Sequence, residues 1–167
     1  MIINNEILTA LIHCNYKAYL KGLNFQALKT DFETVIDELR KIKKQNYIDK
    51  NSIKQEFKEQ LFSDKNNYEV NQIYIDTVFS RNKINIKVDG LYFVEKKMCL
   101  ILISPLEKVT KLDKLIVALQ SYFIQSEFKV KIDFAKVVFG KQFKEAKLKL
   151  SNFQKEISEI ISLIRNT

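Results

Sequence analysis

NIKVDGLYFVEKKMCLILISPLEK, residues 85–108, predicts two neighbouring strands joined by a short charged turn. In its first half apolar residues alternate with Lys87 and Asp89, which is the two-residue period of a strand with one polar face. The run MCLILIS at 98–104 is apolar on both faces, as expected of a strand in the middle of a covered sheet. Pro105 ends that strand. The segment therefore places Asp89 on the polar face of a sheet, beside a central apolar strand.

The rest of the chain divides into further helices and strands around this pair. NQIYIDTVF at 71–79 has the same two-residue period and would complete an antiparallel meander of three strands. The other expected elements are helices at 5–21, 26–44 and 52–62, a helix from Thr110 or Lys111 to Phe123, strands at 133–140 and 144–150, and a last helix that Ser151 or Asn152 caps. This order of three helices, three strands, a helix, two strands and a helix predicts an α/β fold with a mixed central sheet.

The predicted helix at 26–44 repeats apolar residues every three or four positions, which is typical of a helix that packs on a core. We expect its core-facing residues to be Leu28, Phe32, Val35, Ile36, Leu39 and Ile42. The basic run RKIKK at 40–44 either complements the dipole at the end of this helix or binds phosphate.

Composition predicts one domain over residues 1–167, because no glycine- or proline-rich linker divides the chain. The longest uncharged apolar run is too short to span a bilayer, and the first residues lack the basic region of a secretory signal. We therefore expect no membrane partner and a cytoplasmic location. Cys14 and Cys99 stand among apolar neighbours and are expected to be buried thiols. Two cysteines are too few for an iron–sulfur cluster, and none is expected.

The formal charge of +8, from 28 basic and 20 acidic residues, favours a polyanionic partner, and DNA is the expected one. Lysine is abundant together with asparagine and isoleucine, as in proteins encoded by genomes rich in A and T. The excess of lysine therefore has a second interpretation, a solvated surface without a nucleic-acid role.

Four stretches resemble motifs of one enzyme superfamily: ILTALIHCNYKAYLKG at 7–22, KVDGLYFVEKK at 87–97, EKVTKLDKLIVALQSYFI at 107–124 and FAKVVFGKQFKEAKLKL at 134–150. Together they resemble the PD-(D/E)XK nucleases, in particular the RecB-like branch that includes the CRISPR-associated exonucleases. The resemblance implies a restriction-endonuclease-like core and Mg²⁺-dependent cleavage of DNA, with Asp89 as a metal ligand.

The resemblance fails at the second acid of the site. If residues 95–97 form the turn, Ile103 lies opposite Asp89, and Ile103-Ser104-Pro105 stands where the family has its E-x-K. The next acid and lysine are Glu107 and Lys108, which the loop after Pro105 could bring back toward Asp89. The catalytic set predicted from the resemblance is therefore Asp89, Glu107 and Lys108, with Asp89 and Glu107 as ligands of Mg²⁺.

Other residues of the resemblance are less well defined. Glu33 or Glu38 would supply the first-motif acid, and periodicity does not choose between them. The residues that would bind nucleic acid are Lys108, Lys111, Lys114, Gln120 and Tyr122.

Two interpretations of Asp89 remain open: a relic kept because Asp-Gly bends a strand, or the anchor of a variant metal site. The corresponding functions are a DNA-acting member of the nuclease superfamily with a variant or eroded phosphodiesterase site, and a non-catalytic module that binds nucleic acid or protein on the same fold. A third candidate is a scaffold component with no nucleic-acid role.

Overall fold

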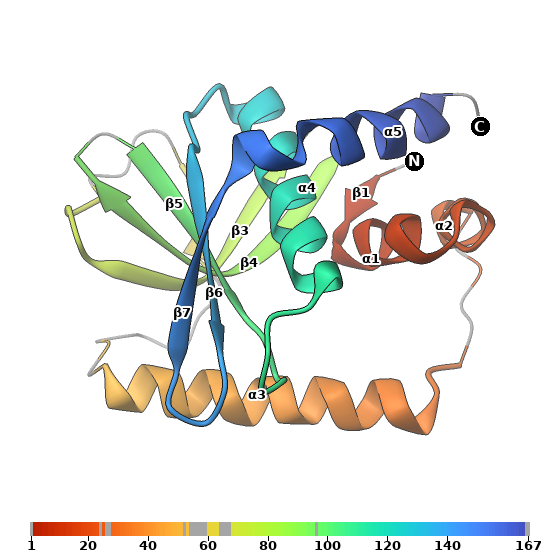
Figure 1. Ribbon diagram of the computed structural model, residues 1–167. Coiled ribbons are helices and arrows are strands. Elements are labelled where there is room, and N and C mark those ends of the chain that lie inside the picture. Colours follow the sequence, from red (N-terminus) through yellow and green to blue (C-terminus); the bar gives the residue numbers. More distant parts are fainter. Residues whose placement is uncertain are drawn as a thin grey trace.

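The computed structural model describes residues 2–23, 25, 28–51, 53, 60–63, 68–95 and 97–165. Their strands are β1 (Ile3–Asn4), β2 (Gln60–Leu61), β3 (Ile73–Arg81), β4 (Ile84–Val94), β5 (Lys97–Ile103), β6 (Phe134–Phe139) and β7 (Lys144–Lys149). The helices are α1 (Asn5–His13), α2 (Asn15–Gly22), α3 (Asp31–Lys50), α4 (Lys111–Phe128) and α5 (Gln154–Arg165), the last preceded by the 3-10 helix η1 (Leu150–Phe153). Figure 1 shows the helices around a twisted central sheet.

The sheet joins strands from both halves of the described chain. It has seven strands in the order β2-β3-β4-β5-β6-β7, with β1 paired to β4. β3, β4 and β5 form the antiparallel meander, β5 and β6 are parallel, and β7 returns antiparallel to β6. The predicted α/β class with a mixed sheet is therefore confirmed. None of the described helices is long and apolar enough to cross a membrane.

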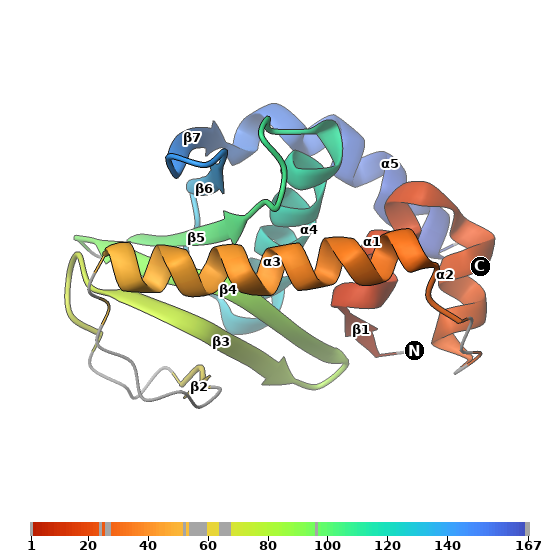
Figure 2. The same ribbon diagram turned by 90° about the horizontal axis from the view of Figure 1, so that it is seen from below.

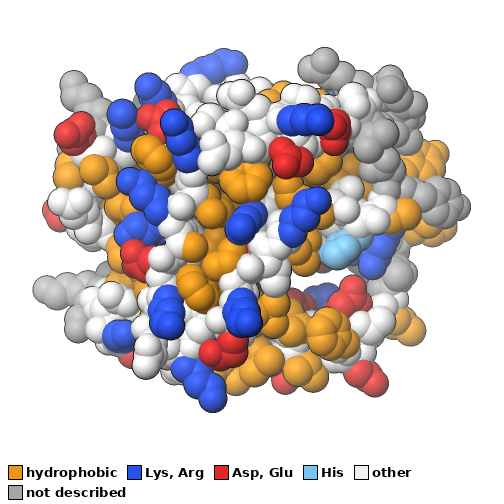
Figure 3. All heavy atoms as spheres, viewed as in Figure 1, with side chains coloured by type: hydrophobic (Ala, Val, Ile, Leu, Met, Phe, Trp, Pro, Cys, Tyr) orange, Lys and Arg blue, Asp and Glu red, His pale blue; other side chains and the backbone are white. Residues whose placement is uncertain are grey.

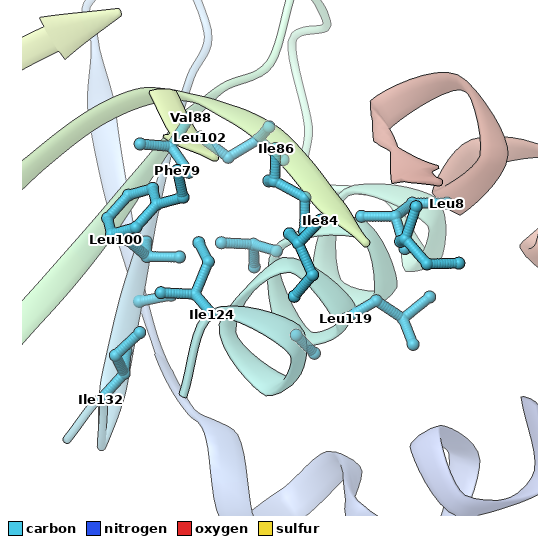
Figure 4. Packing of buried hydrophobic residues seen from close by; sticks show 14 of the residues in the cluster. Leu8, Phe79, Ile84, Ile86, Val88, Leu100, Leu102, Leu119, Ile124 and Ile132 are labelled. Atoms are coloured by element: carbon cyan, nitrogen blue, oxygen red, sulfur yellow. The ribbon is translucent and has the colours of Figure 1, made fainter. Parts of the chain in front are cut away.

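The main core lies between the sheet and α4. Phe79, Ile86 and Leu100 come from three adjacent strands and meet Leu119 and Ile124 of α4, and all five side chains are fully buried (Figure 4). Burial of each such side chain stabilises the fold by roughly 1.5–3 kcal/mol relative to exposure. The core therefore fixes β3, β4 and β5 beneath α4.

A smaller cluster occupies the opposite face of the sheet, beneath α3. Tyr47 of α3 packs there with Ile101, Ile103 and Val138. Leu100 and Leu102 belong to the main core instead, so alternate residues of β5 serve the two faces, as its continuous apolar sequence predicted.

The predicted helix at 5–21 is two helices in the structure. Cys14 has an extended backbone, with φ −166° and ψ 120°, and separates α1 from α2. No local sequence feature that we identify explains this break. Cys14 is exposed, so the prediction of a buried thiol is wrong there and correct for Cys99.

α3 begins at residue 31 rather than 26 because Thr30 caps it. The Thr30 hydroxyl accepts a hydrogen bond from Glu33 N, and the Glu33 carboxylate accepts one from Thr30 N, which is a capping box. The predicted core-facing residues are wrong in all but one case, since Leu28, Phe32, Val35, Leu39 and Ile42 are exposed. The reason is that the N-terminal part of α3 extends beyond the sheet (Figure 1, Figure 2) and the helix packs through its C-terminal Tyr47 and Ile48.

The predicted helix at 52–62 has a different outcome. Residues 52 and 54–59 lie outside the described residues, and Gln60–Leu61 forms strand β2. β2 pairs in parallel with β3, and Phe62 N donates to Val78 O at 2.8 Å. The helix prediction is therefore wrong at its C-terminal end, because the open edge of β3 provides backbone partners there.

Candidate functional site

Asp89 lies at a break in the alternation of β4. Val88 and Leu91 both pack in the main core, although residues three apart in a regular strand point to opposite faces. The break falls on Asp89 and Gly90, as the Asp-Gly sequence predicted. A Cβ atom at Gly90 would lie 3.3 Å from Ile75 Cδ1 and 3.4 Å from Ile101 Cβ, so glycine allows the neighbouring strands to pack closely at this point.

The two carboxylate oxygens of Asp89 have different partners. Oδ2 accepts a hydrogen bond from the backbone N–H of Ile103 at 2.9 Å. Oδ1 lies 3.1 Å from Nζ of Lys44, which comes from α3. Asp89 therefore links the end of β5 to the helix that covers this face of the sheet.

A second carboxylate faces the same lysine from strand β3. Asp76 lies between the register pairs Ile75–Gly90 and Thr77–Val88, so it stands across from Asp89. Its Oδ1 is 2.7 Å from Lys44 Nζ. Asp76 has a left-handed backbone with φ 52°, which aspartate tolerates better than most residues, and this irregularity accompanies the break on β4. The acidic neighbour of Asp89 is therefore Asp76 on β3, whereas the resemblance predicted Glu107 in the loop after β5.

The ammonium of Lys44 offsets one of the two negative charges of Asp76 and Asp89. Burial would lower the pKa of Lys44, but attraction to Asp89 and the hydrogen bond to Asp76 outweigh this effect and raise the pKa above its ordinary value of 10.5. Lys44 is thus protonated at neutral pH. Lys87 adds a second, more exposed ammonium 3.4 Å from Asp76 Oδ1. We refer to Asp76, Asp89, Lys44 and Lys87 as the acid–lysine cluster, in which two acids face two lysines.

The strand register at β5 differs by one residue from the prediction. Phe93 pairs with Met98 and Gly90 with Ile101, because β4 ends at Val94 and its register partner Lys97 already belongs to β5. Glu95 adopts the left-handed backbone, with φ 56°, that a two-residue turn requires. The prediction that Ile103 stands opposite Asp89 is therefore wrong in register, although the Asp89 carboxylate still reaches the Ile103 N–H.

The position expected to hold the second acid is apolar and closed. Ile103 is fully buried beneath α3. Ser104 is also fully buried, and its hydroxyl donates to Asp113 Oδ2 at 3.2 Å. Asp113 completes a capping box with Thr110, so this polar contact serves the start of α4. An ionised acid at Ile103 would be buried among Tyr47, Ile101 and Val138.

The loop after Pro105 leads away toward the β6–β7 turn. Leu106 O accepts a hydrogen bond from Gly140 N at 3.0 Å, and Glu107 Oε2 accepts one from Lys141 N at 3.4 Å. Lys108 is exposed. The structure brings Asp89 together with Asp76 and Lys44, and it gives Glu107 a separate partner.

The acid–lysine cluster does not fit a resident Mg²⁺. Within the described ranges, no three carboxylate, histidine or cysteine side chains gather where they could hold a metal ion. A Mg²⁺ ion between Asp76 and Asp89 would have to displace the Lys44 ammonium that lies within 3.1 Å of both carboxylates. The Lys44 ammonium therefore already occupies the position between the two carboxylates.

The residues predicted to bind nucleic acid lie in different environments. Lys108, Lys111 and Tyr122 are exposed, and Lys114 is half-buried. Gln120 is buried and its side-chain amide donates to Lys87 O at 3.4 Å, so it ties α4 to β4. Contact between Gln120 and a nucleic acid would require this bond to open.

The two candidates for the first-motif acid lie on α3. Glu33 serves the capping box, and its hydrogen bond with the Thr30 backbone is the main cause that lowers the pKa of Glu33. Its other oxygen lies 3.6 Å from Lys17 Nζ. Glu38 is exposed. The structure therefore assigns Glu33 a role in starting α3.

No protein-family model matches this sequence, and no curated protein matches it. Among solved structures, the one titled "Crystal structure of SSO0001" matches with 13% sequence identity over 97% of this chain and 76% of that chain. The TM-score is 0.46. We draw no functional conclusion from a likeness at this level.

Proposed function

We propose that this chain binds nucleic acid without cleaving it, on a nuclease-like core whose metal site has been replaced by a lysine. The observation that carries this proposal is the position of Lys44 Nζ, 2.7 Å from Asp76 and 3.1 Å from Asp89. Two acids and a lysine are the residue types that metal-dependent phosphodiester cleavage uses. Here Lys44, together with Lys87 beside Asp76, offsets the charge of the two acids, so that charge is not available to hold a metal.

The surroundings of the cluster support the same conclusion. The second oxygen of Asp89 accepts a hydrogen bond from the backbone N–H of Ile103, and the Ile103 side chain is apolar and fully buried. Only 13% of the Asp89 side chain and 17% of the Lys44 side chain are exposed. A substrate phosphate would therefore meet a nearly closed ion pair instead of an open coordination site.

The positive net charge of the chain supports the nucleic-acid-binding part of this proposal. The chain has an excess of eight positive charges, and Figure 3 shows lysine and arginine side chains spread over the face that carries β6 and β7, with fewer acidic side chains among them. Lysines that neutralise phosphates release bound counterions, which makes such binding strongly dependent on salt.

The test is a cleavage and binding assay on the same protein sample. Single-stranded and duplex DNA are incubated with Mg²⁺ or Mn²⁺, beside a chelator control and the Asp89→Ala variant. We expect salt-sensitive binding and no cleavage under any condition. Cleavage that both the chelator and Asp89→Ala abolish would show an active metal site, and the absence of binding at low salt would remove the nucleic-acid role.

The exposed side of α3 favours a second candidate function, association with another copy of the chain. The α3 stripe consists of Phe32, Val35, Leu39 and Ile42, each between 44% and 72% exposed. Residues 31–38 include four acids and no base, whereas residues 40–43 include three bases and no acid. Antiparallel pairing of two α3 helices would bury the stripe and place opposite charges together.

Light scattering after size exclusion tests this association. We expect a dimer for the natural chain and a monomer for Leu39→Glu. A natural chain that stays monomeric at high concentration would contradict it.

A further inference from the structure

One face of the sheet carries rings and lysines in register across several strands. The register pairs place Ile73, Tyr92, Cys99, Phe134 and Lys149 in one row that crosses β3, β4, β5, β6 and β7. The adjacent row contains Ile75, Gly90, Ile101, Lys136 and Lys147. We refer to Tyr92, Phe134, Lys136, Lys147 and Lys149 as the aromatic–lysine face.

α3 covers only part of this side of the sheet. Tyr47 of α3 packs on Ile101, Ile103 and Val138, and Figure 2 shows α3 crossing β4 and β5 while β6 and β7 lie to one side. Tyr92 and Phe134 are half-buried, and Lys147 and Lys149 are exposed. Tyr92 packs against the Tyr47 cluster, so the aromatic–lysine face runs from the border of α3 at Tyr92 to the exposed lysines of β7.

Two of the lysines lie over the rings. Lys136 Nζ is 4.7 Å from the centroid of Tyr92, and Lys147 Nζ is 4.1 Å from the centroid of Phe134. Such cation–π contacts are weak at exposed sites, at roughly 0.5–1 kcal/mol. A phosphate can therefore draw each ammonium off its ring at low cost, and the movement uncovers an aromatic surface.

The same two lysines oppose each other directly across β6 and β7. Lys136 and Lys147 are register partners, and like charges placed opposite each other destabilise a strand pair. Glu145 lies 2.8 Å from Lys136 and offsets part of this repulsion. A bound phosphate would reduce the remaining repulsion between Lys136 and Lys147. We therefore expect this surface to bind a polyanion more tightly than isolated lysines would.

A cleft lies beside α4, on the opposite side of the sheet from α3. This cleft has a volume of about 530 Å³, and Phe134 and Lys149 line it together with Lys97 and Tyr122. Lys97 is 3.2 Å from Asp133 at the start of β6. Phe134 and Lys149 lie at the ends of β6 and β7, so they border both this cleft and the aromatic–lysine face.

We propose that the aromatic–lysine face binds single-stranded nucleic acid, with phosphates on Lys136, Lys147 and Lys149 and bases stacked on Tyr92 and Phe134. This inference rests on the proposed function and assigns the binding of nucleic acid to this face. Stacking on aromatic rings beside a basic track is how sequence-tolerant single-strand binders hold their ligand. A duplex offers phosphates but keeps its bases paired, so it gains nothing from the rings.

Fluorescence anisotropy with labelled oligo-dT, oligo-U and duplex DNA tests the inference, each probe being about 20 nucleotides long to exceed the usual site size. Oligo-dT and oligo-U distinguish DNA from RNA as the source of the single strand. We expect both to bind more tightly than the duplex.

Two variants address the two parts of the site. Phe134→Leu keeps an apolar side chain and removes the stacking surface, and we expect it to weaken single-strand binding roughly tenfold. Lys147→Gln with Lys149→Gln should weaken binding and reduce the slope of log affinity against log salt by about 1.4, or ~0.7 for each phosphate that is no longer neutralised. The matched control is Lys83→Gln with Lys129→Gln, an exposed pair with the same change of charge, which we expect to alter affinity less than twofold, since neither lysine lies on the aromatic–lysine face. Circular dichroism checks that each variant is folded.

The outcomes separate this inference from the proposed function. No salt-sensitive binding by the natural chain would overturn both. Binding that Lys108→Gln with Lys111→Gln weakens, while Phe134→Leu and the Lys147 and Lys149 changes leave it intact, would overturn the inference alone. Tighter binding of duplex than of single strands would also overturn it.

Discussion

Replacement of Lys44 by methionine tests whether its ammonium serves as the cation of Asp76 and Asp89. At the observed distances of 2.7 and 3.1 Å, each contact corresponds to an attraction of roughly 5–6 kcal/mol at an effective dielectric constant of ~20, before desolvation is subtracted. Loss of one partner from a fully buried ion pair costs about 3–5 kcal/mol, because the remaining charge stays buried. The three side chains are 13–27% exposed, so we expect Lys44→Met to lower the free energy of unfolding by ~2–3 kcal/mol.

Equilibrium unfolding in urea at neutral pH measures this loss. Lys41→Met removes an exposed lysine from the same helix and should change stability by less than ~0.5 kcal/mol. Adding Asp76→Asn to Lys44→Met should recover ~1–2 kcal/mol, because a neutral amide no longer repels Asp89. If Lys44→Met cost no more than Lys41→Met, or if Asp76→Asn deepened the loss, the Lys44 ammonium would not be the cation that stabilises Asp76 and Asp89.

Three further predictions concern pH, the closed end of β5 and the start of α4. The pKa of Lys44 lies above 10.5 and burial raises the pKa of Tyr47 to about 12; the unfolded chain therefore loses these protons first, and the free energy of unfolding should fall as pH rises above ~10. Tyr47→Phe should make that fall shallower, and an unchanged slope in alkaline urea titrations would contradict the assignment. Ile103→Glu should lower stability by more than ~3 kcal/mol without producing cleavage, because the new carboxylate would be buried among Tyr47, Ile101 and Val138; a stable variant with metal-dependent activity would show that the site can be rebuilt. Thr110→Ala removes the N-cap that accepts a hydrogen bond from Asp113 N and should cost ~1–2 kcal/mol in thermal unfolding, whereas Thr110→Ser should be nearly neutral.

Local patterns were sufficient to predict most of the sheet. β3, β4, β5, β6 and β7 lie within two residues of their predicted bounds, since alternating or continuous apolar runs set their faces. The turn after β4 was predicted one residue too long, and this error shifted the register of β5 by one. A turn of two residues with a left-handed Glu95 cannot be distinguished from a turn of three by hydrophobic pattern alone.

Helix α3 shows what periodicity cannot provide. Its apolar residues have helical spacing, but spacing does not say which face meets the core, and Leu39 and Ile42 are exposed while Tyr47 is buried. The start of α3 was available from the sequence, because Thr30 and Glu33 have the spacing of a capping box. The break at Cys14 has no such signal.

The candidate site was half predictable. Asp89 was placed correctly on a polar face at a strand irregularity. Asp76 could have been found, since a two-residue turn between Arg81 and Ile84 puts it opposite Asp89 by counting along the hairpin. Lys44 could not have been found from the sequence. It lies 32 residues before Asp76 in the chain, and the two meet only because α3 packs across the sheet.

The central claim is that the chain binds nucleic acid at a site that does not cut it. The most direct test is to incubate labelled single-stranded DNA with the natural chain and Mg²⁺ or Mn²⁺, and to follow anisotropy and strand length in the same tube. We predict a bound and intact strand that added salt releases. A strand that is shortened with metal, and spared in Asp89→Ala or with a chelator, would contradict the claim.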